Sequence, residues 1–97
     1  MKAIWNGKII ANSTETLVIE GNQYFPPKDI YREYLHDSDF HTTCPWKGEA
    51  SYYSITVDGQ ENENAAWYYP TPKPTSLEVV GKDYSNYVAF WQGVNIA

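Results

Sequence analysis

Short runs of β-branched and aromatic residues alternate with turn-forming residues along most of the chain. Asn6-Gly7 is the strongest turn signal, because both central positions of a two-residue hairpin turn tolerate a positive φ. Gly21-Asn22 and Asp58-Gly59 end two of the later runs. This alternation is typical of an all-β protein. The predicted strands cover residues 3–5, 8–11, 16–20, 23–25, 49–57, 64–69 and 87–91, with 93–97 as a continuation of the last.

One segment departs from the β pattern. Residues 28–35 follow two prolines, and Ile30, Tyr31, Tyr34 and Leu35 share one face at helical spacing. The spacing predicts a short helix of about two turns. Residues 70–74 contain three prolines, which cannot donate ladder hydrogen bonds, so we expect a stiff extended connection there. Residues 77–80 fit either a short strand or a helical turn.

The longest predicted strand carries large side chains on both faces. Alternation places Tyr53, Ile55 and Val57 on one face and Tyr52 on the other. In the two runs that follow, Trp67 and Tyr69 lie opposite Tyr68, and Tyr87, Ala89 and Trp91 lie opposite Val88 and Phe90. Rings on both faces predict a small antiparallel β barrel or tent-like sheets, with a core on one side and a partly covered concavity on the other.

The size of the chain predicts a single domain over residues 1–97, since two smaller units would each lack a sufficient core. Tyr, Trp and Phe make up 16% of the residues, whereas Leu occurs three times and Met once. Aromatic side chains cover a large area at low rotamer cost. We therefore expect rings to do most of the packing.

The net charge of −5 argues against binding to nucleic acid, because phosphates require clustered basic residues and the seven here are dispersed. No stretch approaches membrane length, and the first residues do not resemble a signal peptide. A single Cys excludes an internal disulfide and a Cys-based zinc site. We expect a soluble cytoplasmic domain, monomeric or homodimeric, with no membrane association and no cofactor.

The strongest candidate site is a set of four rings, Trp46, Tyr52, Trp67 and Tyr69. Rings around a concavity can stack on a flat ligand or hold a cation, and they can equally form plain core. The neighbouring Lys47-Gly48 can present an ammonium and exposed backbone N–H groups to an anion, with Arg32 converging on the same place. These residues predict a ligand site.

Cys44 is a weaker candidate, as a nucleophile with His41 or His36 as its base. No third residue that would orient the imidazole is identifiable. The alternative is a small apolar residue at the start of a strand. His36, His41 and Cys44 lack the spacing of a ligand motif, so no metal site is predicted.

Three blocks of sequence carry a family resemblance. They are residues 44–53 (Cys-Pro-Trp-Lys-Gly-Glu-Ala-Ser-Tyr-Tyr), residues 65–70 (Ala-Ala-Trp-Tyr-Tyr-Pro) with the two prolines that follow, and residues 87–90 (Tyr-Val-Ala-Phe). Together with residues 24–27 and 32–34, they resemble the domain of unknown function 427 family over essentially the whole chain. The resemblance implies a β-tent-like fold, mostly bacterial and fungal members, and no established role. Residues 82–86 look like an insertion relative to the family pattern.

The family also carries a nucleotidyltransferase-like label. The chain has neither a glycine-rich phosphate loop nor a close pair of acidic residues on one strand to hold two Mg²⁺ ions. Three interpretations stay open. The preferred one is a β domain that binds a small flat or anionic ligand in an aromatic pocket. The others are an enzyme, either nucleotidyltransferase-like or Cys44-dependent, and a protein-interaction module without a chemical site.

Overall fold

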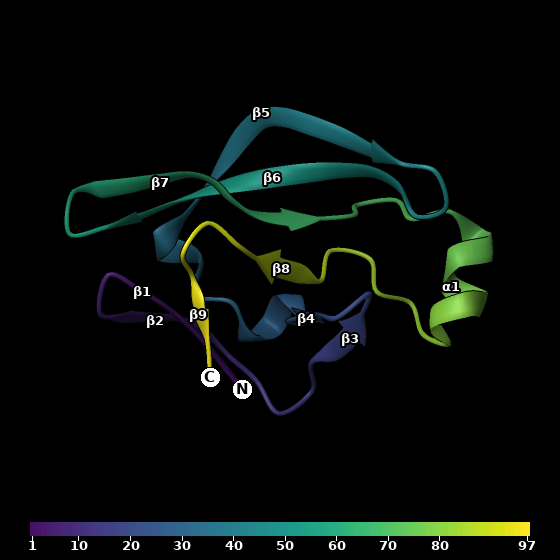
Figure 1. The fold of residues 1–97 in the computed structure, drawn as a ribbon, viewed down its shortest axis with the longest axis horizontal. Helices are drawn as coiled ribbons and strands as arrows, with labels where there is room; N and C mark the ends of the chain where they lie inside the picture. The colour runs from purple at the N-terminus through teal and green to yellow at the C-terminus, as the bar shows by residue number, and fades with distance from the viewer.

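Nine strands arranged in three antiparallel sheets, with one short α-helix, make up the computed structural model, which describes residues 1–97 (Figure 1). The strands are β1 (Lys2–Trp5), β2 (Lys8–Asn12), β3 (Leu17–Ile19), β4 (Asn22–Tyr24), β5 (Leu35–Cys44), β6 (Gly48–Val57), β7 (Gln60–Tyr68), β8 (Val88–Phe90) and β9 (Asn95–Ile96). The helix is α1 (Pro74–Val80), and two 3₁₀ turns cover Pro27–Asp29 and Arg32–Tyr34.

The largest sheet has the strand order β5-β6-β7-β8 and contains the long β6–β7 hairpin. The other sheets are smaller, with the orders β2-β1-β9 and β3-β4. A pair of backbone hydrogen bonds between Phe25 and Val88 joins the end of β4 to β8. The prediction of a mainly β fold of antiparallel sheets with one short helix is confirmed, and the sheets do not close into a barrel.

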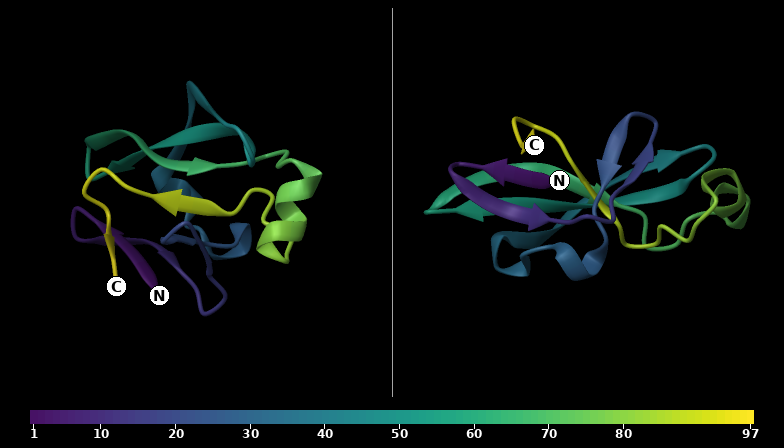
Figure 2. Two further views of the ribbon diagram at one scale, coloured as in Figure 1. Left: turned by 45° about the vertical axis from the view of Figure 1, so that its right-hand side comes forward. Right: turned by 90° about the horizontal axis from the view of Figure 1, so that it is seen from below.

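The two ends of the chain lie side by side, and α1 lies at the opposite end of the molecule from the β6–β7 turn (Figures 1 and 2). Lys2 and Ala97 exchange backbone hydrogen bonds of 2.7 and 2.9 Å. No helix is both long enough and apolar enough to cross a membrane.

The large sheet separates two hydrophobic clusters, as the alternation along its strands predicts. Tyr53, Ile55 and Val57 of β6 belong to one cluster, together with Val88 and Phe90 of β8. The second cluster lies on the other face and is built mainly of rings. Its buried members are Ile19, Tyr24, Ala50, Tyr52, Tyr69, Tyr84 and Ala89, with Trp46, Trp67 and Tyr87 packed against it. Aromatic side chains therefore pack both sides of one sheet.

An irregularity in the β6–β7 pairing centres on Asn64, which has a left-handed backbone conformation with φ of 55°. Its backbone N–H donates to Ser54 Oγ at 3.1 Å, and its side-chain oxygen accepts from Ser38 of β5. Its backbone carbonyl accepts from the indole of Trp91 at 2.6 Å. Asn64 thus ties the end of β8 to the centre of the large sheet.

The helix predicted over residues 28–35 is wrong. Two separate 3₁₀ turns occupy part of this segment, and β5 begins at Leu35. Ile30 forms an antiparallel bridge with Ala11, and the Tyr31 N–H donates to the carbonyl of Ile10 at 3.0 Å. These contacts with β2 hold the backbone extended at residues 30 and 31, which overrides the local helical pattern.

The only α-helix begins instead at Pro74, the last of the three clustered prolines. Proline suits this first helical position, because its missing N–H would have no helical partner there. Gly81 ends the helix with φ of 84°, and its N–H donates to the carbonyl of Leu77. Ser76 is buried and accepts a hydrogen bond from Tyr84 at 2.9 Å. Residues 77–80 are therefore helical.

β5 is a strand that the sequence pattern does not predict. It spans ten residues, pairs only with β6, and is interrupted between Asp37 and His41. Most of its side chains are exposed, including those of Asp37, Asp39 and Phe40. A polar edge strand lacks the alternation that marks a half-buried one, which explains why residues 35–40 give no β signal.

Candidate functional site

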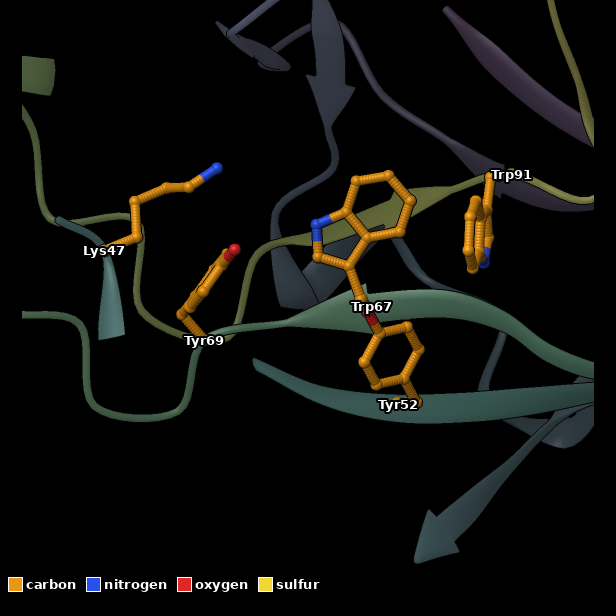
Figure 3. A pocket seen from close by; sticks show the side chains of 5 residues that line it. All are labelled: Lys47, Tyr52, Trp67, Tyr69 and Trp91. Atoms are coloured by element: carbon orange, nitrogen blue, oxygen red, sulfur yellow. The ribbon is translucent and has the colours of Figure 1, made fainter. Parts of the chain in front are cut away.

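Five side chains line a pocket of about 210 Å³ on the ring-rich face of the large sheet (Figure 3). Tyr52 comes from β6, Trp67 from β7, Tyr69 from just beyond β7, and Trp91 from just beyond β8. Lys47, from the turn before β6, completes the lining. We call this site the aromatic pocket. The β6–β7 and β7–β8 pairings bring these separate segments together.

Three of the four rings have their polar atoms bound within the chain. The Trp67 N–H donates to the hydroxyl of Tyr24 at 3.0 Å, and the Trp91 N–H donates to Asn64. The Tyr52 hydroxyl lies 3.0 Å from the hydroxyl of Thr42. The two indoles meet edge to face with centroids 5.8 Å apart. These rings are held in place and present mainly apolar surface to the pocket.

Lys47 is unusual because its side chain is buried although it carries an ammonium group. Only 5% of the residue is exposed. Its Nζ donates a hydrogen bond to the carboxylate of Glu20, whose own side chain is half exposed. The ammonium also lies 5.2 Å from the ring centre of Tyr69 and 5.3 Å from that of Trp46. The charge is therefore held by one carboxylate and by aromatic rings.

The same contacts explain the acid–base behaviour of this group. Burial alone lowers the pKa of Lys47, but the hydrogen bond to Glu20 and the nearby Tyr24 and Tyr69 outweigh burial and raise that pKa. The hydrogen bond from Lys47 lowers the pKa of Glu20. Both residues are thus charged near neutral pH.

Tyr69 is the one ring of the aromatic pocket whose polar group has no acceptor for its own proton. The residue is 5% exposed, and its hydroxyl oxygen interacts with the Lys47 ammonium. Burial raises its pKa to about 12, so the hydroxyl stays protonated. In Figure 3 the Lys47 nitrogen and the Tyr69 oxygen both point toward the side of the pocket where Trp67 lies. One end of the pocket therefore carries two donor groups, the Lys47 ammonium and the Tyr69 hydroxyl.

Trp46 lies outside the aromatic pocket and lines a separate hollow of about 350 Å³ between the β3–β4 hairpin and α1. We call it the valine hollow; its lining is Val18, Ile19, Glu20, Trp46, Val79 and Val80. Val18 and Val79 are 63% and 75% exposed. Glu20 lines this hollow and also binds Lys47, so it lies between the two concavities.

Gly48 and Arg32 also lie outside the lining of the aromatic pocket. Gly48 has φ of 112°, and a β-carbon there would lie 3.5 Å from the carbonyl oxygen of Thr71. That distance is an ordinary contact, so the backbone conformation rather than lack of space favours glycine here. Arg32 donates to the hydroxyl of Tyr53 at 3.2 Å, on the opposite face of the sheet. The expected convergence of Arg32 with Lys47 does not occur.

Cys44 is half-buried and packs against the ring-rich cluster. No hydrogen bond joins its sulfur to His41, whose Nδ1 instead lies 3.2 Å from Ser51 Oγ. No group of three or more His, Cys, Asp or Glu side chains gathers in a way that would hold a metal ion.

The sequence analysis singled out Lys47, Tyr52, Trp67 and Tyr69, which lie together, and missed Trp91 and Glu20. Alternation had placed Trp91 on the same face as Ala89. This alternation could have added Trp91 to the candidate site. Trp91 lies just beyond the end of β8, however, where strand alternation is a weaker guide to side-chain direction. Nothing local marks Glu20, because only the fold brings it to Lys47 across 27 residues.

Comparison with known proteins identifies one family. A family model described as "Domain of unknown function (DUF427)" and carrying a nucleotidyltransferase-like label matches residues 1–96. No curated protein matches the chain.

Proposed function

We propose that this chain, which belongs to the DUF427 family, is a binding domain that takes a small flat ligand in the aromatic pocket. The observation that carries the proposal is the convergence of four rings and one ammonium on a single solvent-accessible pocket. Ligand sites are commonly concave, mostly apolar and supplied with a few directed polar groups. This pocket has that character.

The size and shape of the lining favour a flat ligand. The pocket volume of about 210 Å³ is smaller than that of sites for drug-sized molecules, which hold roughly 300–1,000 Å³. One or two fused rings would therefore be the right scale. The faces and edges of Trp67 and Trp91 offer stacking surfaces, and stacked or edge-to-face aromatic pairs add about 0.5–1.5 kcal/mol beyond area burial.

A thermal-shift screen of the wild-type chain tests this function. The library holds flat aromatic acids, amides and bases, together with nucleoside triphosphates with and without Mg²⁺. We expect stabilisation by a subset of the flat compounds. A screen in which no flat compound raises the melting temperature refutes the proposal, and a shift that requires both triphosphate and Mg²⁺ replaces it with a nucleotide-dependent activity.

Variants of the rings test whether a compound found in the screen binds in the aromatic pocket. Trp91 is 44% exposed, so Trp91→Ala is expected to weaken binding with little loss of stability. Tyr31→Ala is the matched control, since Tyr31 is 40% exposed and does not line the pocket. Trp67→Ala is expected to weaken binding or unfold the domain, whereas Trp67→Phe keeps an aromatic surface and the fold. If Trp91→Ala and Tyr31→Ala bind the compound equally well, the compound binds outside the aromatic pocket.

A second candidate function, protein interaction, is favoured by one observation. Val18 and Val79, the most exposed of the large hydrophobic residues, both border the valine hollow. A second copy of the chain covering them would form a homodimer. Light scattering over a range of concentrations tests this alternative, with Val79→Asp as the variant. A monomer at every concentration excludes the homodimer.

A further inference from the structure

The ammonium of Lys47 is buried and has one charged partner. An ammonium carries three N–H donors. Glu20 supplies the carboxylate acceptor, and the hydroxyls of Tyr24 and Tyr69 are the neutral partners. Hydrogen bonds between two charged groups are the stronger ones. Because Lys47 also lines the aromatic pocket, a carboxylate that enters the pocket can bind the ammonium in place of Glu20.

The Tyr69 hydroxyl adds a second donor at the same end. The residue is almost fully buried; its oxygen interacts with the Lys47 ammonium, and its own O–H has no acceptor within the chain. The opposite side of the pocket, at Trp91, has no free polar atom, because the indole N–H is already bound to Asn64. The ligand should therefore have an oxygen-bearing end at Lys47 and Tyr69 and an apolar ring at the other end.

The charges in the pocket exclude a cationic end. The Lys47 ammonium already lies over the ring of Tyr69, so a second positive charge in the same small pocket would be repelled at short range. One ammonium and one hydroxyl match the two oxygens of a carboxylate. A phosphate carries more charge and more acceptor oxygens than these two groups can serve.

The chain itself shows that Lys47 takes a carboxylate, because Glu20 supplies one. Glu20 lies in the β3–β4 turn with φ of 53°, a left-handed conformation that is unfavourable for a glutamate. Four of the six non-glycine residues with positive φ are Asn or Asp, which tolerate this region well. The turn does not require Glu, whereas the contact with Lys47 does. Its half-exposed side chain can also return to water easily.

From these observations we infer that the ligand of the aromatic pocket is a flat aromatic carboxylate, and that its carboxylate takes Lys47 from Glu20. Glu20 then acts as an internal competitor that occupies the ammonium while the pocket is empty. The inference rests on the proposed function of the aromatic pocket. To that function it adds two statements: the ligand is an anion, and Glu20 limits the affinity of the pocket for it.

Calorimetric titration with a matched pair of probes, 2-naphthoate and 2-naphthamide, tests the inference. The two share one ring system and differ in charge. Wild-type protein is expected to bind the carboxylate at least about tenfold more tightly than the amide, since hydrogen bonds to charged groups are the stronger ones. Lys47→Met should remove this preference, so that the two probes bind with similar affinity.

Glu20 variants give the sharper result. Glu20→Gln should raise the affinity for 2-naphthoate by about fivefold, the range expected for removal of a half-exposed ion pair, without changing that for 2-naphthamide. Glu20→Asp keeps the charge, shortens the side chain and suits the turn, so it should act in the same direction if the first variant folds poorly. Glu61→Gln, an exposed carboxylate outside both concavities, is the matched control and should bind like wild type.

The outcomes separate this inference from the proposed function. Equal binding of both probes, tighter binding of 2-naphthyl phosphate, or unchanged carboxylate affinity in both Glu20 variants overturns the inference and leaves a flat-ligand pocket. Failure of all the probes to bind wild-type protein overturns the inference, and failure of the whole screen overturns the proposed function as well.

Discussion

Replacing Ser76 by alanine tests how α1 is fixed to the ring-rich cluster. The Ser76 hydroxyl accepts from Tyr84 at 2.9 Å and donates to the carbonyl of Lys73 at 2.6 Å. Both Ser76 and Tyr84 are at most 1% exposed. Tyr84 in turn packs edge to face against Tyr69, which lines the aromatic pocket, with ring centres 6.1 Å apart. This small network therefore supports the pocket from behind.

The two single substitutions should differ in cost. Ser76→Ala leaves the Tyr84 hydroxyl buried without a partner, which typically costs about 1–3 kcal/mol. The Lys73 carbonyl keeps the backbone N–H of Ser76 as a donor at 2.9 Å. Tyr84→Phe removes one neutral hydrogen bond and leaves Ser76 bound to Lys73, so its cost should be about 1 kcal/mol. For a domain of this size, 1 kcal/mol corresponds to a shift of roughly 4–8 °C in Tm.

The double variant distinguishes this explanation from simple loss of packing. In Ser76→Ala with Tyr84→Phe no hydroxyl is left unpaired, so the combined cost should stay near or below that of Ser76→Ala alone. Urea denaturation of the four proteins measures the coupling, which we expect at about 1 kcal/mol. Additive costs would refute the reasoning. Binding of a pocket ligand should survive in Tyr84→Phe, because the ring that supports Tyr69 remains.

Three further predictions concern pH, the thiol and the backbone. Burial raises the pKa of Tyr69 from 10.0 to about 12, so Tyr69 ionises first in the unfolded chain, and the free energy of unfolding should fall between about pH 10 and 12. Urea titrations at several pH values should show a shallower fall for Tyr69→Phe than for wild type. An identical pH profile for the two proteins would contradict this. Cys44→Ser should change the free energy of unfolding by less than about 1 kcal/mol and leave probe binding intact, since the half-buried sulfur makes no hydrogen bond to either imidazole. Loss of probe binding in a folded variant would restore the hypothesis that the thiol is functional. Asn64→Ala should be less stable than Asn64→Gly by about 1 kcal/mol, because φ is 55° there, and equal melting temperatures would count against that strain.

The parts of the fold that follow from sequence are those with a strong local signal. Asn6-Gly7 and Asp58-Gly59 form turns between strands as predicted, with positive φ at all four residues. The alternation along β6 sorts its side chains between the two clusters correctly. Local geometry decides these features, so a single sequence carries them.

The parts that sequence does not reveal depend on distant contacts. The backbone of Ile30 is extended because it meets Ala11, a partner that no window around residue 30 contains. The candidate site shows the same limit. Lys47 was recognisable as a polar residue beside rings, but its burial and its contact with Glu20 exist only once the β3–β4 hairpin folds against the turn before β6.

The break in β5 between Asp37 and His41 has a consequence for the solubility of the protein. A straight ten-residue strand with one free side would offer a row of amides and carbonyls to strands of other molecules, which invites aggregation. The kink interrupts that row, and the charges of Asp37 and Asp39 add repulsion there. A version of this segment without the kink and without the two charges should therefore remain folded, yet it should precipitate at concentrations that the natural sequence tolerates.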